Sequence, residues 1–174
     1  MACVQVLSGL SVNCEPNVGG LIEVYIANYS DVASVALDET SNKIKTITMD
    51  STKKFKKYSF RRGSSSFTST LNVDDTNGTS FIQTDLALTF AKMDTTKRIE
   101  IQALSLGELA VIVHDCNGVY WYLGYNEAVM ATAGGAASGA GRSDANNYTV
   151  TLTDFSPKYP YEVDPAALAD IVEE

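Results

Sequence analysis

The sequence predicts a mainly β protein: an antiparallel β-sandwich or barrel with one flanking helix and an extended C-terminal arm. Short runs of β-branched and aromatic residues recur along the 174 residues, and Gly, Asn and Asp turn signals separate them. One internal segment carries both a helix start signal and a helix stop signal. We therefore expect one β-rich domain over residues 1–156 and the arm over residues 157–174.

Strand patterns fill the first part of the chain. The stretch CVQVLSGLSV at residues 3–12 alternates apolar and polar side chains, as a half-buried strand does. GGLIEVYIANYSDV, from residue 19, begins with a Gly pair that can turn the chain and continues with β-formers. VASVALDETSNKIKTITM, from residue 32, predicts two short strands around a polar turn near residues 38–42.

A long basic hairpin region is expected over about residues 43–80. Its block KKFKKYSFRR, residues 53–62, holds six of the thirteen Lys and Arg residues of the chain, interleaved with aromatic residues. The six are Lys53, Lys54, Lys56, Lys57, Arg61 and Arg62. This concentration of charge makes the block the first candidate for a contact surface.

The second half of the basic hairpin region predicts a strand, a turn and a longer strand. The turn is DDTNG, where Asn77 and Gly78 supply residues that accept a positive φ. The strand after it is expected to run from Thr79 to Ala91, with an apolar residue at most alternate positions.

The segment DTTKRIEIQALSLG, residues 94–107, is the predicted helix. Asp94 or Thr95 can cap its start, and Gly107 can end it in the left-handed conformation. The interior IEIQALSL also fits strand alternation, but the start and stop signals favour the helix.

The remaining segments predict a hairpin, a loop, a strand and the arm. ELAVIVHD and VYWYLGY flank Asn117-Gly118, the strongest short hairpin signal. ATAGGAASGAGRSDANN, about residues 131–147, has no periodicity and predicts a flexible loop. YTVTLTDF then predicts a strand. The arm can end in a short helix with Asp164 as N-cap and Pro165 in the first turn.

His114, Asp115 and Cys116 are the residue types of a nucleophilic site, so strand geometry decides whether they can act together. A two-residue turn in this hairpin pairs His114 with Trp121. Successive strand residues point to opposite faces, which turns Asp115 away from the other two. The hairpin therefore predicts cross-strand packing, and a functional thiol at Cys116 is the less favoured alternative.

No metal, cofactor or catalytic site is predicted. One His and three scattered Cys show no paired-ligand spacing, and the acidic turns lack the periodicity of a calcium loop. The net charge of -8 and the pI of about 4.6 argue against nucleic-acid binding by the whole surface. Without a membrane-length apolar run or the basic start of a signal peptide, we expect a protein made in the cytoplasm with reduced cysteines.

The basic block has three interpretations. It can be a solvated strand face, a contact for an acidic surface on another copy or partner, or a nucleic-acid contact. The arm supplies an acidic surface, made of Glu162, Asp164, Asp170, Glu173 and Glu174. We therefore take the six basic residues, with Glu162 and Asp164, as candidate contacts between copies that assemble head to tail through complementary charge.

The second half of the chain carries an ordered series of patterns. The predicted helix precedes the hairpin NGVYWYLGY, and a Gly/Ala/Ser-rich loop with Asp144 and Asn146 leads into a strand with alternating Thr. A Pro/Tyr segment closes the series. Over roughly residues 80–164, this series resembles structural proteins of tailed phages of gut Bacteroidales, including the crAss-like group. The basic, aromatic segment at residues 43–67 has no counterpart in the resemblance.

The resemblance implies a fold of the phage tail-tube type and a virion structural protein rather than an enzyme. Such proteins form homo-oligomeric rings in the phage tail or in the head-to-tail connector (the neck), where they are part of the conduit for the genome. The expected partners are other copies of the chain, other phage tail or portal-complex proteins, and DNA that passes transiently without specific binding; no membrane is expected. Two other classes stay open: a surface or secreted β-sandwich binding module, and a cysteine-dependent enzyme.

Overall fold

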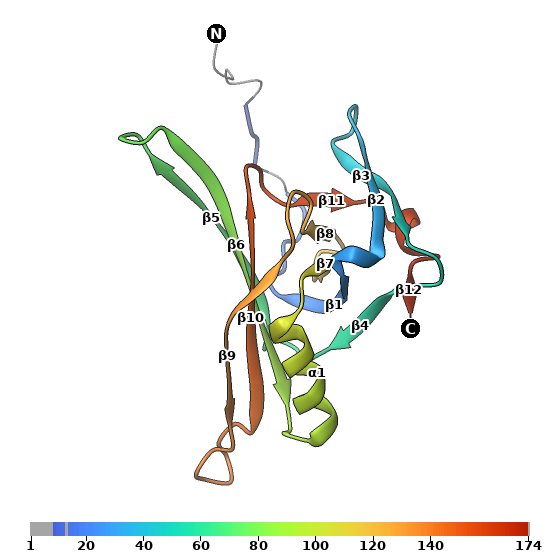
Figure 1. Ribbon diagram of the computed structural model, residues 1–174. Helices are drawn as coiled ribbons and strands as arrows, with labels where there is room; N and C mark the ends of the chain where they lie inside the picture. The colour runs from blue at the N-terminus through green and yellow to red at the C-terminus, as the bar shows by residue number, and fades with distance from the viewer. Residues whose placement is uncertain (1–8, 13, 174) are drawn as a thin grey trace.

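Two sheets make up the structure, a computed structural model that describes residues 9–12 and 14–173 (Figure 1). The eight-stranded sheet has the order β12-β4-β1-β7-β8-β11-β3-β2. Its strands are β1 (Leu21–Asn28), β2 (Val32–Asp38), β3 (Lys43–Met49), β4 (Phe55–Ser59), β7 (Leu109–Asp115), β8 (Tyr120–Leu123), β11 (Tyr161–Val163) and β12 (Val172–Glu173). The four-stranded sheet has the order β5-β6-β10-β9, with β5 (Ser66–Asp74), β6 (Thr79–Ala91), β9 (Met130–Ala137) and β10 (Asn147–Ser156).

The helices are one α-helix, α1 (Thr95–Leu106), and two short 3-10 turns, η1 (Tyr29–Asp31) and η2 (Pro165–Leu168). The prediction of a mainly β, sandwich-like fold with one flanking helix is confirmed. Most strand pairs are antiparallel, as expected, but β11 pairs with β3 and β12 pairs with β4 in parallel. Both parallel pairs arise because the C-terminal segment returns to strands made much earlier in the chain.

Strand β7 is buried on both faces and separates two apolar cores. Val111 faces the first core, which lies between the sheets and includes Leu86 and Leu152 of the four-stranded sheet. Ile112 faces the second core, which the larger sheet forms with the C-terminal turn around Leu168. A strand with two buried faces has no polar side, which explains the continuous apolar run LAVIV. Each fully buried Val or Ile side chain stabilises the fold by about 1.5–3 kcal/mol.

Helix α1 begins as predicted and lies against β9 and β10. The Asp94 side chain accepts a hydrogen bond from the backbone N–H of Lys97 at 2.8 Å, which caps the first turn. The predicted left-handed end at Gly107 is wrong, because its φ is -88°. Glycine is needed there for space: a Cβ would lie 3.2 Å from the Leu109 side chain and 3.3 Å from the carbonyl oxygen of Ala103.

The β7–β8 hairpin forms around the predicted Asn-Gly turn, but its register is one residue away from the predicted one. His114 lies opposite Tyr120, so the predicted pair of His114 with Trp121 is wrong. A two-residue type I′ turn needs a positive φ at both central residues, and Asn117 has none. Only Gly118 has a positive φ, of 81°, which gives a longer loop with a bulge at the glycine.

The β5–β6 hairpin has the predicted strand bounds for β6, Thr79–Ala91. In its turn only Gly78 has a positive φ, of 66°, so the expectation for Asn77 is wrong. The Asp74 carboxylate instead accepts hydrogen bonds from the Thr76 and Asn77 backbones, which holds the turn with ordinary φ angles. Figure 1 shows that the tip of this hairpin extends beyond the neighbouring strands.

The segment at residues 131–147, predicted as a flexible loop, begins as a strand. Residues Met130–Ala137 form β9 and pair with β10, so the loop is confined to residues 138–146. One of its glycines lies close to the neighbouring strand: a Cβ on Gly134 would lie 3.0 Å from the carbonyl oxygen of Thr149. At Gly134 the missing side chain therefore permits a close backbone approach.

The two ends of the chain also differ from expectation. The strand predicted at residues 3–12 lies mainly outside the described residues; residues 9–12 form no strand, and Leu10 and Val12 are exposed. The predicted arm lies along the domain instead of extending from it, because β11 and β12 join the larger sheet. Asp164 caps the turn between them as predicted, but the turn is 3-10 rather than α-helical.

Candidate assembly surface

The six basic residues predicted as contacts lie on and beside β4, and all are exposed. Two precede the strand, two lie within it and two belong to the turn that follows it: Lys53 and Lys54, Lys56 and Lys57, Arg61 and Arg62. Side chains alternate along a strand, so Lys56 and Lys57 point to opposite faces of the sheet. The structure thus divides the basic block between two environments.

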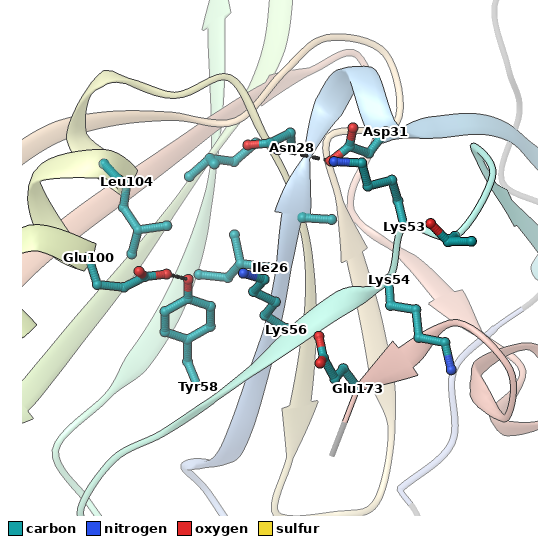
Figure 2. Close-up of a pocket in the computed structure, with 14 residues that line it drawn as sticks. Ile26, Asn28, Asp31, Lys53, Lys54, Lys56, Tyr58, Glu100, Leu104 and Glu173 are labelled. Carbon is teal, nitrogen blue, oxygen red and sulfur yellow. Dashed lines mark hydrogen bonds between the residues drawn. The ribbon is translucent and has the colours of Figure 1, made fainter. Parts of the chain in front are cut away.

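Lys56 and the two lysines before the strand border a hollow of about 510 Å³ between β4, the end of β1 and α1 (Figure 2). Three carboxylates share its lining, those of Asp31, Glu100 and Glu173. The Tyr58 hydroxyl donates a hydrogen bond to Glu100. Burial is the larger cause of the raised pKa of Tyr58, and this hydrogen bond raises the pKa further. Equal numbers of lysines and carboxylates suit ion pairing with another protein better than capture of a phosphate.

Lys57 belongs to a second cluster, centred on Glu23 of β1. The Lys57 ammonium lies 2.7 Å from Glu23 Oε2, and the Tyr25 hydroxyl donates a hydrogen bond of 2.5 Å to Oε1. His114 Nδ1 lies 3.3 Å from the same oxygen, and its ring stacks on Tyr120 with centroids 4.1 Å apart. Burial raises the pKa of Glu23, but the hydrogen bonds from Lys57, Tyr25 and His114 outweigh it and lower the pKa overall. Lys57 is therefore a structural cation of this sheet.

The two acids predicted as contacts also have partners within the chain. Glu162 Oε1 lies 2.5 Å from the Lys43 ammonium, across the parallel strands β11 and β3. Asp164 Oδ1 accepts a hydrogen bond of 3.0 Å from the backbone of Ala166. Both acids thus have partners outside the basic block.

The His114–Asp115–Cys116 sequence forms no relay. His114 contacts Glu23 on one face, whereas Asp115 Oδ2 accepts a hydrogen bond of 2.9 Å from the indole N–H of Trp121. The other Asp115 oxygen accepts two backbone hydrogen bonds within the turn. The half-buried Cys116 lies beside Gly20, where its Sγ is 3.5 Å from the position of an added Cβ. The three side chains therefore serve packing and turn formation.

In the part of the chain that the structure describes, the four-stranded sheet is open at both edges, β5 and β9. Near the hairpin tip, β5 carries Leu71 and Val73, whose side chains are 51% and 61% exposed. Leu71 pairs with Ile82 of β6, so the two side chains share one face of the sheet. Further along β5 and β6, the same face of the sheet packs against the core. Figure 1 shows that the hairpin tip reaches beyond the strands of the larger sheet. An open backbone edge beside uncovered apolar side chains is the usual form of a strand-pairing surface.

One acid is buried without full hydrogen bonding. Asp154 of β10 is only 4% exposed, and its Oδ1 has no partner among the described residues. The pKa of Asp154 is raised to about 6, mainly by burial. A backbone hydrogen bond from Gly124 lowers the pKa, and the charge of Glu127 raises it. An isolated buried carboxyl of this kind favours its neutral form.

Sequence reasoning located the basic residues but not the apolar edge. A cluster of Lys and Arg is visible in any sequence, since charge does not depend on the fold. Leu71 and Val73 have ordinary strand alternation, and only the limited extent of the other sheet leaves them exposed. Their position next to the DDTNG turn is the one available signal, because hairpin tips are where a sandwich leaves a strand uncovered.

Comparisons of the chain with protein-family models, with curated proteins and with solved structures gave no match. Over residues 9–12 and 14–173, no three His, Cys, Asp or Glu side chains gather as metal ligands would. The helices of this part of the chain include none with the length and apolar character needed to cross a membrane.

Proposed function

We propose that this chain is a virion structural protein of a tailed phage, and that it forms a homo-oligomeric ring in the tail or the head-to-tail connector. The open four-stranded sheet carries the proposal. Unpaired strand edges are a liability in a protein that works alone, and contact with neighbouring copies removes them. A ring satisfies every such contact when the rotation between copies closes.

Two further features support the phage assignment. The resemblance at residues 80–164 runs from β6 to the start of η2 and includes α1 and the central β7–β8 hairpin. The net charge of -8 suits the wall of a conduit, since negative charge keeps DNA phosphates from adhering. The partners in this proposal are other copies, other tail or portal-complex proteins, and DNA in transit.

The proposal assigns the chain no catalytic role. His114, Asp115 and Cys116 have separate structural partners, so a relay through them would require the hairpin to rearrange. The cysteine-dependent enzyme is therefore not retained as a second candidate.

Electron microscopy of the purified chain, together with protein analysis of virions, tests the proposal. We expect rings or short tubes from the wild-type chain. The double variant Leu71→Lys and Val73→Lys should give monomers, because charge on the open edge opposes strand pairing. Ile99→Lys is the matched control, since Ile99 is 56% exposed on α1 and should leave the rings intact. A wild-type chain that is monomeric at every concentration and absent from virions would refute the proposal.

A further inference from the structure

The N-terminal segment at residues 9–12 has the residue pattern of a strand, but it pairs with no strand among the described residues. Leu10 and Val12 are the most exposed large apolar side chains of the described residues, at 103% and 96%. They lie two positions apart and share a face in an extended chain, while Gly9 and Ser11 occupy the other face. This alternation is the pattern of a strand with one buried side.

The base of the segment is fixed on the β7–β8 turn. The backbone N–H of Val18 donates to Asn117 Oδ1 at 2.8 Å, and Asn117 Nδ2 donates to Asn17 Oδ1 at 3.0 Å. Residues 17–20 also border a small hollow with Ser66, at the start of β5. In Figure 1, residues 9–12 lie apart from β5 instead of following it. Within residues 9–12 and 14–173, neither the segment nor the free edge of β5 has a strand partner.

The β5 edge has the complementary pattern. Leu71 and Val73 also lie two positions apart on one face, and Thr70 and Asn72 occupy the other. A strand placed on this edge with its apolar side chains beside Leu71 and Val73 would put Gly9 and Ser11 beside the polar pair. Apolar side chains would then match apolar ones on one face, and polar residues would match polar ones on the other.

The other long edges fit the segment less well. On β9 the exposed residues are mostly Gly and Ala, which offer no pair of large apolar side chains. On β2, Val32, Val35 and Leu37 already pack against the second core. The β5 edge is therefore the best match for an added strand with two apolar side chains.

We propose that residues 9–12 of one copy add as a fifth strand to the β5 edge of a second copy. This inference rests on the proposed self-assembly and names one contact that produces it. The contact joins different surfaces of the two copies, so it can repeat from copy to copy around a ring. Its affinity comes from backbone hydrogen bonds along β5, and its register comes from Leu10 and Val12 against Leu71 and Val73.

Disulfide trapping tests the contact directly. In a chain with the natural cysteines Cys3, Cys14 and Cys116 replaced by Ser, one preparation carries Leu10→Cys and another carries Leu71→Cys or Val73→Cys. Mixing and mild oxidation should give a dimer that contains one chain of each kind. Met130→Cys, on the open β9 edge and 54% exposed, is the matched control and should give little mixed dimer.

A chain that carries both Leu10→Cys and Val73→Cys distinguishes two arrangements. In one, the N-terminal segment pairs with β5 of another copy; in the other, it pairs with β5 of its own copy. Efficient closure into a cross-linked monomer, without mixed dimers in the first experiment, would overturn the proposal in favour of a segment that covers its own β5. Absence of any cross-link to β5 would overturn it as well.

Self-association of the double variant Leu10→Ser and Val12→Ser gives an independent measure. We expect association to weaken roughly a hundredfold, about tenfold for each apolar side chain removed. The fold should be unchanged by circular dichroism, because residues 10 and 12 are fully exposed in the single chain. Leu106→Ser, at an 83% exposed position on α1, is the control and should associate like the wild type.

The outcomes distinguish this inference from the proposed function. If the double variant Leu10→Ser and Val12→Ser forms the same rings as the wild type with the same affinity, the N-terminal contact is refuted. The proposed function as a ring protein then still stands. If the wild-type chain forms no assembly and is absent from virions, the proposed function fails, and this inference fails with it.

Discussion

At the scale of single residues, Asp115 organises the central hairpin. Its two oxygens accept hydrogen bonds of 2.9 and 3.0 Å from the turn backbone and one of 2.9 Å from the Trp121 indole. One carboxylate thus fixes the loop conformation and the orientation of the only tryptophan. The residue that looked like the acid of a catalytic site is a turn cap.

Asp115→Ala should destabilise the protein by about 2 kcal/mol, because it leaves two backbone donors and the indole N–H without their acceptor. Urea denaturation followed by Trp121 fluorescence measures the effect, and the emission of the folded variant should shift as the indole loses its partner. Cys116→Ser in the same loop is the control and should change stability by less than about 0.5 kcal/mol. A stable Asp115→Ala chain with unchanged emission would contradict this role.

Asp154 is the second residue with a specific energetic consequence. Its pKa of about 6 in the folded chain lies above the ordinary value of 3.8. A raised carboxyl pKa means that the folded state favours the protonated form. The stabilising contribution of that proton is therefore complete below about pH 3.8 and is lost as the pH rises through about 6.

Relative to Asp154→Asn, the wild-type chain should lose roughly 2–3 kcal/mol of stability between pH 4 and pH 8, from a pKa difference of about two units. Urea denaturation of both chains across this range measures the difference. Asp170→Asn, at an exposed position, should follow the wild-type pH profile. Parallel profiles for the wild type and Asp154→Asn would show that Asp154 does not titrate in this range.

At the scale of elements, prediction succeeded where a polarity pattern and an end signal agree. The strand that follows the DDTNG turn has both, whereas the Asp94 cap decided for the helix, because the helix interior also fits strand alternation. Strand β9 was missed because its Gly and Ala residues give no polarity pattern, and pairing with β10 rather than side-chain polarity defines it. The one-residue error at Asn117 arose because the dipeptide Asn-Gly suits two loop lengths, and strand twist and packing choose between them.

Two neighbouring glycines of β9 should respond differently to the same change. Gly134→Ala should cost about 1 kcal/mol or more, because the new Cβ would lie 3.0 Å from a rigid backbone carbonyl oxygen. Gly135→Ala meets only the Thr149 hydroxyl at 3.5 Å and should be neutral or stabilising by about 0.5 kcal/mol. Thermal unfolding of the two variants makes the comparison. Equal effects would mean that β9 is not held at this distance from β10.

At the scale of the whole molecule, the structure narrows the surface that charge can use for assembly. Lys57, Glu162 and Asp164 have partners within the chain, which the sequence alone could not show. The ion pairs of Lys57 and Glu162 join strands that are far apart in the chain. They depend on the order of strands in the sheet, which cannot be read from the amino-acid composition. Lys53, Lys54 and Lys56 remain as exposed lysines beside the hollow.

Lys53→Glu combined with Lys54→Glu should weaken self-association about tenfold at low ionic strength, if these lysines face an acidic surface of a neighbour. The difference should vanish near 1 M salt, where screening acts over about 3 Å. Sedimentation velocity at both salt concentrations measures it. Lys92→Glu, a single charge reversal near α1, is the control. An equal loss of association in this variant would mean that the net charge, and not the position of the lysines, causes the effect.

The position of β4 has a consequence for how the protein is made. Its two neighbours in the sheet are β1, near the start of the chain, and β12 at residues 172–173. During translation, β4 therefore waits for its second neighbour until Val172 has left the ribosome. Long-range pairings of this kind slow folding and expose strand edges on the way. A nascent chain that stops short of Val172 lacks the parallel β12–β4 pair and keeps that edge of β4 open.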